Sequence, residues 1–223
     1  MSHEVEQRHI KQLSVMRGWL DGKGFFKAAD ALEFVRQMEQ GLRKDGKTPK
    51  FHHQLSIARL LSTLTPHLAF PEETLTAAFL HDVLEDHGDV VSREMLEIRF
   101  GKTVAEAVWK LTKKCNGLTK TYEMYFAEMA TCPIASLVKM ADRAHNVISM
   151  PGVFTLEKQR KYVDEVDTYF FPMVRVARRL HSRQYGAYEN LKILLRCEVK
   201  LVRLSMEGCD GSEVRNIPDP EHP

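Results

Sequence analysis

Apolar residues recur along most of the chain at the three- and four-residue spacing of an amphipathic α-helix. The segment FFKAADALEFVRQMEQGL shows it well, because its apolar residues gather on one broad side. No segment shows the alternation that is typical of a half-buried strand. We therefore predict an all-α protein. Further helices are predicted over 52–64, 72–87, 92–99, 103–114, 121–130, 134–149, 155–182 and 186–206.

The predicted helices are separated by short turns, such as Asp45-Gly46 and Asn116-Gly117. A chain of 223 residues that is 43% hydrophobic can bury one full core, so one domain is expected. We place that domain at 25–205, after an N-terminal extension at 1–24. The last segment, 206–223, is rich in Gly, Pro and acidic residues and is predicted to be a flexible tail.

Charge and cysteine content narrow the class of protein. The net charge of +2 comes from 32 basic and 30 acidic residues that are interspersed along the chain. This distribution gives no large positive electrostatic field for binding nucleic acid. The four cysteines form no C-x-x-C pair, so neither a zinc knuckle nor a disulfide framework is indicated. The N-terminus lacks the apolar run of a signal peptide, and no segment has the roughly 20 apolar residues of a membrane span. We expect a cytoplasmic protein.

Polar side chains interrupt the apolar pattern in the segment LTAAFLHDVLEDHGD, at His81, Asp82, Glu85 and Asp86. His81 and Glu85 are four residues apart and Asp82 and Glu85 three apart, so a continuous helix would place them on one side. Because burial of an unpartnered polar group costs free energy, the pattern favours a shared ion or water. A His-Asp pair alone is common by chance and establishes nothing.

A second apolar helix, IASLVKMADRAHNVISM, carries Asp142, Arg143, His145 and Asn146. Asp142 and Asn146 are four residues apart and share a side of this helix. An isolated histidine in such a helix is more often a satisfied core residue than a ligand. The co-occurrence of this block with the previous one raises the expectation of a site.

The pair His52 and His53 opens the predicted helix 52–64, and only one of the two need point inward. Two imidazoles and two carboxylates from three helices would form a mixed nitrogen and oxygen set, which suits Mn²⁺ or Fe²⁺ better than a thiolate-rich site would. Such an ion activates water and neutralises phosphoryl charge, while Glu85 or Asp86 could hold the water or pass on its proton. A metal ion with adjacent carboxylates is the combination of groups expected in a metal-dependent hydrolase.

In this order the three blocks resemble the hydrolase domains of the RelA/SpoT family and their single-domain relatives, the small alarmone hydrolases. The segment RKDGKTPKFHHQLSIARL resembles the opening motif of that family. AAFLHDVLEDHGDV resembles its H-D-x-x-E-D helix, and RFGKTVAEAVWKLTK resembles its F-G-x-x-V segment. ASLVKMADRAHNV resembles its third block. The likeness runs from about residue 25 to 180 and includes Tyr169 and Pro172. It implies an HD-domain helical bundle of about 8 to 11 helices.

The resemblance implies hydrolysis of the 3′-pyrophosphate of guanosine tetra- or pentaphosphate, (p)ppGpp, to GDP or GTP and pyrophosphate. One Mn²⁺ ion is the expected cofactor, with Fe²⁺, Zn²⁺ or Mg²⁺ as alternatives. Arg43 is expected to stack on guanine unless Lys44 takes its place. The expected metal ligands are His53, His81, Asp82 and Asp142. Glu85 and Asp86 are expected to serve the attacking water. The expected substrate contacts are Arg43, Lys44, Lys139, Asn146 and Ser149.

Two departures from the family pattern leave the substrate open. Gln54 stands where relatives usually have proline, and Ile148 where they usually have a basic residue. The resemblance also admits (p)ppApp, pyrophosphorylated tRNA 3′ ends or the phosphate of NADPH, and a catalytically inactive module that binds a nucleotide. The near-balanced charge favours a small free nucleotide over nucleic acid. A toxic synthetase with the opposite activity is a candidate partner, and no membrane contact is expected.

Four lysines gather between Lys110 and Lys120, at positions 110, 113, 114 and 120. Their charge could attract a polyphosphate if this segment folds over the site. The alternative is a solvated edge of the domain.

Overall fold

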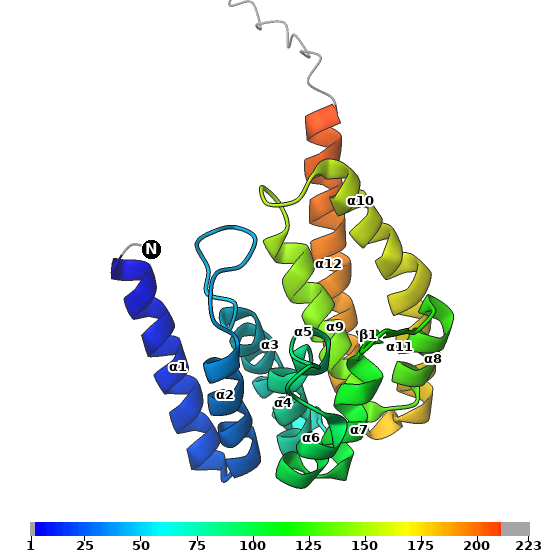
Figure 1. The fold of residues 1–223 in the computed structure, drawn as a ribbon. Coiled ribbons are helices and arrows are strands. Elements are labelled where there is room, and N and C mark those ends of the chain that lie inside the picture. The colour runs from blue at the N-terminus through cyan, green and yellow to red at the C-terminus, as the bar shows by residue number, and fades with distance from the viewer. Residues whose placement is uncertain (1–2, 211–223) are drawn as a thin grey trace, which may run out of the picture.

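The computed structural model describes residues 3–210, and these are almost entirely helical (Figure 1), which confirms the all-α prediction. The elements, in chain order, are α1 (His3–Lys23), α2 (Phe26–Met38), α3 (His52–Ser62), η1 (Thr65–His67), α4 (Pro71–Leu80), α5 (Val83–Asp86), α6 (Arg93–Phe100), α7 (Lys102–Leu111), β1 (Lys114–Cys115), β2 (Leu118–Thr119), α8 (Tyr122–Ala130), α9 (Pro133–Ser149), α10 (Leu156–Glu165), η2 (Val166–Phe170), α11 (Phe171–Leu180), η3 (Ser182–Gln184) and α12 (Tyr185–Asp210).

Two helices, α4 and α9, form the centre of the molecule. All residues from Thr74 to Leu80 are buried, and α9 is buried along most of its length. Helix α4 packs against α2, α3, α7 and α9, while α9 also packs against α8, α10, α11 and the long α12. A helix that is apolar on nearly all sides must be covered on nearly all sides, so these two sequences require the central position.

The helices begin where the sequence supplies capping groups. The side-chain oxygens of Ser92, Thr121 and Thr155 each accept a hydrogen bond from the backbone N–H three residues later. Pro71 and Pro133 occupy the first residue of α4 and α9, where a missing N–H costs nothing. The local chemistry thus fixes the start of both central helices.

The predicted helix 72–87 is wrong in one respect, because the chain leaves the helix at His81 and Asp82 before α5 begins. The His81 Nδ1 atom lies 2.9 Å from the carbonyl oxygen of Ala78. In a continuous helix that carbonyl would accept from the backbone N–H of Asp82. A side chain that occupies the acceptor interrupts the helical ladder, and one helix becomes two.

Two further predictions need correction. The predicted helix 155–182 is divided by the π-helical turn η2 before Pro172, which has no N–H to continue the ladder. The predicted helix 103–114 stops at Leu111 and is followed by the antiparallel pair β1–β2, so the expectation of no strands is wrong here. Asn116 and Gly117, both with positive φ, form the turn, as an Asn-Gly hairpin requires.

The two ends of the chain differ from the proposed division. In α1, Met16 and Leu20 belong to the hydrophobic core, and the helix packs on α2 and α3. The predicted tail 206–223 begins too early, because α12 continues to Asp210 and buries Met206, which extends the apolar side one turn beyond Val202. Residues 211–223 lie outside the described part. Within it, no helix is long and apolar enough to cross a membrane.

Glu198 is a buried acid on α12 whose Oε2 atom has no hydrogen-bond partner among residues 3–210. Burial raises the pKa of this carboxyl to about 7. The folded state therefore keeps the proton to a higher pH than the unfolded state, and stability falls as the pH rises from about 4.5 through 7. We expect Glu198→Gln to stabilise the protein at pH 8 by about 1–2 kcal/mol and to have little effect below pH 5.

Urea unfolding followed by circular dichroism at pH 5 and pH 8 measures this difference. Glu189→Gln is the matched control, because Glu189 lies on the same helix but pairs with Lys192. That variant should gain no stability at pH 8. A Glu198→Gln variant with the same pH dependence as the unsubstituted protein would contradict the prediction.

Candidate functional site

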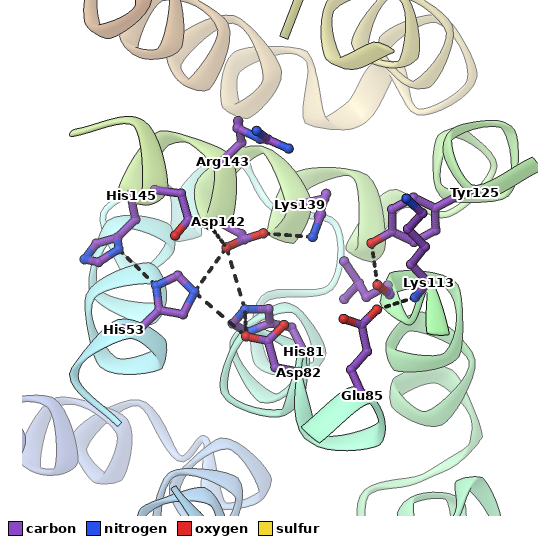
Figure 2. Close-up of polar contacts among 12 residues, drawn as sticks. His53, His81, Asp82, Glu85, Lys113, Tyr125, Lys139, Asp142, Arg143 and His145 are labelled. Atoms are coloured by element: carbon purple, nitrogen blue, oxygen red, sulfur yellow. Dashed lines mark hydrogen bonds and ion pairs between the residues drawn. The ribbon is translucent and has the colours of Figure 1, made fainter. Parts of the chain in front are cut away.

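His53 on α3 and His81 with Asp82, between α4 and α5, point toward Asp142 on α9 (Figure 2). The Nε2 atom of His53 lies 3.1 Å from Asp142 Oδ1 and 3.9 Å from Asp82 Oδ2. The Nε2 atom of His81 lies 2.9 Å from Asp82 Oδ2 and 3.8 Å from Asp142 Oδ1. One atom each of His53, His81 and Asp82 lies within 4.8 Å of the others, a spacing that can hold a metal ion.

The backbone fixes the orientation of the His81 ring. A carbonyl oxygen can only accept, so His81 Nδ1 carries the hydrogen that is donated to Ala78. This leaves Nε2 facing the carboxylates, where it is buried and forms no well-directed hydrogen bond within the described structure despite its closeness to Asp82. Burial alone would lower the pKa of His81, but the adjacent Asp82 carboxylate raises it to about 9.

Asp142 is buried in α9 and is compensated from several sides. Lys139 Nζ lies 2.9 Å from its Oδ2 atom, and Asn146 donates to its Oδ1 atom at 2.7 Å. Burial would raise the pKa of Asp142, but Lys139 and His53 together hold it well below its usual value. Asp142 is therefore a carboxylate at neutral pH, and its predicted sharing of one helix side with Asn146 is confirmed.

Glu85 and Asp86 lie on α5, next to Asp82. The backbone N–H groups of Lys113 and Lys114, at the start of the β1–β2 hairpin, both donate to Glu85 Oε1. Figure 2 shows the contact with Lys113. Burial and the charge of Asp82 raise the pKa of Asp86. The hairpin thus holds one carboxylate in place, while the neighbouring one has an increased affinity for a proton.

A cavity of about 500 Å³ connects these residues. Residues of the loop between α2 and α3 and of the connection between α9 and α10 form part of its wall. These two segments lie at the same end of the molecule (Figure 1). Of the predicted site residues, all but His81 line this cavity, and His81 is buried behind it. The predicted residues that line it are Arg43, Lys44, His53, Asp82, Glu85, Asp86, Lys139, Asp142, Asn146 and Ser149.

Several contacts within the cavity bear on the predicted substrate residues. Arg43 Nη2 donates to Asn146 Oδ1 at 3.3 Å, and its Nη1 atom is buried without a partner among the described residues. Ser149 donates to the carbonyl of Asn146 at 3.3 Å. Of the two departures from the family pattern, Gln54 lines the cavity and Ile148 is exposed. Only Gln54 can therefore touch a molecule bound there.

The lysine cluster at 110–120 does not line the cavity. Lys110 donates to Thr131, and Lys120 pairs with Glu128 at 2.8 Å. The ammonium group of Lys113 lies over the Tyr122 ring, 3.3 Å from its centre. The contribution of this segment to the site is thus its backbone N–H groups and not the side-chain charge that the sequence suggested.

The cavity also has an aromatic part that the sequence pattern does not indicate. Phe154, after α9, and Tyr162, on α10, both line it, with ring centres 5.5 Å apart and planes at 64°. Lys44 and Lys158 lie over the Phe154 ring at 5.7 and 3.8 Å. Nothing in the spacing of these residues marks them, because only the folded connection brings them to the cavity. Glu39 and Lys50 also line it and were not predicted.

The fold and this cluster define an all-helical protein with a paired histidine and aspartate centre. The family model described as HD domain matches residues 31–181. The chain therefore belongs to the HD domain family, and the predicted resemblance is confirmed at this level.

Two curated relatives share about a third of the aligned residues with this chain. A protein of Synechocystis sp. named "Probable guanosine-3′,5′-bis(diphosphate) 3′-pyrophosphohydrolase" is 34% identical over 142 residues, 60% of this chain and 18% of that protein. An Aquifex aeolicus protein named "Guanosine-3′,5′-bis(diphosphate) 3′-pyrophosphohydrolase" is 31% identical over 148 residues, which are 64% of this chain and 20% of that protein. The chain thus spans about a fifth of the length of these relatives.

A solved structure supports the fold. Described as "A metazoan ortholog of SpoT hydrolyzes ppGpp and plays a role in starvation responses", it superposes with a TM-score of 0.56 and 24% identity. The match covers 78% of this chain and 94% of that one. At this level of identity the likeness shows a shared helical fold.

Gly88 follows α5 and lies against the hairpin that holds Glu85. A Cβ atom at this position would come within 2.5 Å of the Leu84 carbonyl oxygen and 3.0 Å of Cys115 Sγ. We expect Gly88→Ala to destabilise the protein by about 1–3 kcal/mol, because backbone at that distance must move. Urea unfolding measures the change.

Gly18→Ala is the control for this prediction. It lies within α1, and a Cβ atom there meets nothing within 4 Å. Alanine should therefore stabilise that helix by about 0.5–1 kcal/mol. Equal stability of the two variants would show that the close packing at Gly88 has no energetic consequence.

Proposed function

We propose that the protein hydrolyses the 3′-pyrophosphate of (p)ppGpp, releasing GDP or GTP and pyrophosphate, with one divalent metal ion at His53, His81, Asp82 and Asp142. The observation that carries the proposal is that one cavity contains both the histidine and aspartate centre and a set of basic and aromatic side chains. The names of the curated relatives support the same reaction.

The residues present fit a metal ion. His81 Nε2 is a buried nitrogen without a well-directed partner in the described part of the chain. Its tautomer leaves a lone pair available for coordination once the nitrogen is deprotonated. The donor set of two imidazoles and two carboxylates suits Mn²⁺, Fe²⁺ or Zn²⁺. We propose Mn²⁺. When bound, such an ion supplies Lewis acidity toward water and neutralises charge on a phosphoryl oxygen.

The carboxylates beside this centre can manage the proton of the attacking water. Hydrolysis forms a bond from the water oxygen to the phosphorus attached to ribose O3′ and breaks the bond between that phosphorus and O3′. Glu85 is held by two backbone N–H groups, so its carboxylate has a fixed place at the cavity wall. Asp86, with its raised pKa, is suited to receive the proton of the water and to pass it to the leaving ribose O3′, which becomes a hydroxyl.

The basic and aromatic residues of the cavity lining suit a nucleotide. Arg43, Lys44 and Lys50 supply positive charge toward phosphates, and the planar guanidinium of Arg43 is suited to stack on a base. Phe154 and Tyr162 provide aromatic surface, and Lys44 lies over the Phe154 ring. An open cavity of this size accommodates one nucleotide.

The function is tested with purified protein, Mn²⁺ and a panel of nucleotides. We expect ppGpp to be converted to GDP and pyrophosphate, and EDTA to abolish the reaction. The panel includes ppApp, NADPH and pyrophosphorylated tRNA, which distinguish a different substrate for the same chemistry. Binding of ppGpp without turnover would identify a nucleotide-binding module and would rule out the proposed hydrolysis.

Variants at Asp82 and Glu85 separate metal binding from turnover. Asp82→Ala should lose the bound metal and with it the activity. Glu85→Gln keeps an oxygen that can accept from the hairpin N–H groups, so it should retain metal while kcat falls about 10²- to 10⁴-fold. Metal content is measured by mass spectrometry and kcat by pyrophosphate release.

Asp89→Ala serves as the control, because Asp89 is an exposed acid three residues beyond Asp86. It should match the unsubstituted protein in both measurements. If the Asp82 and Glu85 variants both remained fully active, the assignment of this site would be wrong.

A further inference from the structure

His145 contacts the outer side of His53. The two Nδ1 atoms lie 3.0 Å apart, and the ring centres are 4.9 Å apart (Figure 2). His145 lies on α9, three residues after Asp142, whose Oδ1 atom is 3.1 Å from the other nitrogen of His53. Helix α9 therefore contacts both nitrogens of this one imidazole, with a carboxylate on one side and a second imidazole on the other.

The short distance between the two Nδ1 atoms permits one hydrogen between them. Two N–H groups facing each other would repel, and two lone pairs would leave no bond. When His53 Nε2 donates its hydrogen to Asp142, His53 Nδ1 must accept, so His145 Nδ1 carries the hydrogen. When the lone pair of His53 Nε2 is used by a cation, the hydrogen of His53 lies on Nδ1 and His145 Nδ1 must accept.

His81 has a different kind of partner. The carbonyl of Ala78 can only accept, so the Nδ1 of that ring always carries hydrogen. A carbonyl or carboxylate opposite His53 Nδ1 would likewise hold the hydrogen there, and a neutral His53 could then not donate to Asp142 without a metal. An imidazole, which can donate or accept at one nitrogen, suits both situations.

We propose that His145 is a positioning residue that sets the tautomer of His53, and that the two rings change tautomer together when a divalent cation binds. This inference rests on the metal site of the proposed function. The consequence is a contribution of His145 to metal affinity without coordination, because a cation on Nε2 polarises the His53 ring and makes its Nδ1–H a stronger donor, so the bond to His145 is stronger in the metal-bound form.

Nitrogen-15 NMR of the histidine side chains tests the coupled change in the unsubstituted protein, with Zn²⁺ as a diamagnetic probe. Without metal, His53 should carry hydrogen on Nε2 and His145 on Nδ1. At saturation with Zn²⁺, His53 should carry it on Nδ1 and His145 on Nε2. A His145 ring that keeps its tautomer, or a His53 ring that stays protonated at Nε2, would overturn the inference.

Metal affinity of variants provides the second test, by calorimetric titration of metal-free protein with Mn²⁺. His145→Leu removes the hydrogen-bonding atom and should weaken binding about 10- to 100-fold. His145→Asn keeps a donor and an acceptor near the place of Nδ1 and should restore most of the affinity. His181→Leu is the control, because His181 contacts the carbonyl of Ala130 and no residue of the site.

The outcomes separate this inference from the proposed function. If the unsubstituted protein binds no Mn²⁺, the proposed metal site fails and the role of His145 fails with it. If that protein binds and His145→Leu binds equally well, only the role of His145 is overturned. An Asn variant as weak as the Leu variant would also overturn it, since the hydrogen bond would then not be the cause. Circular dichroism of each metal-free variant verifies its helical fold.

Discussion

The carboxylate of Asp142 is buried in the central helix, and the arrangement around it depends on compensating its charge. A buried charge that loses a partner is strongly destabilising. Lys139 and Asn146 approach from the same helix, while His53 approaches from α3. The positions of α3 and α9 are therefore linked by an interaction that tolerates little displacement, and the candidate metal centre has its geometry from this contact.

Helix α9 also contacts the aromatic part of the cavity wall. Arg143, next to Asp142, pairs with Glu165 at 2.8 Å and lies between the rings of Tyr162 and Phe170. Since Tyr162 lines the cavity, this arginine determines how the aromatic side of the cavity stands relative to the aspartate. Two successive residues of α9, Asp142 and Arg143, thus contact the histidine and aspartate centre and the aromatic part of the cavity wall, respectively.

The sequence predicted the parts of the site that residue type can reveal. Polar side chains in apolar helices marked His81, Asp82 and Asp142, and helical spacing placed Asn146 beside Asp142. The sequence did not reveal the hydrogen bonds that position Glu85. Their donors are backbone N–H groups, and every residue except proline has such a group. Nor did it reveal Phe154, whose place depends on how the connection after α9 folds against α10.

The break between α4 and α5 shows why periodicity failed at the point where the site is formed. Periodicity assumes that each carbonyl accepts from the backbone N–H four residues later. At Ala78 the acceptor is taken by the His81 side chain. That single hydrogen bond ends α4, re-aims Asp82 and the short α5 relative to a continuous helix, and fixes the His81 tautomer. The local departure from helical structure and the chemistry expected of His81 therefore have one physical cause, and a sequence that kept a regular helix here would lose both.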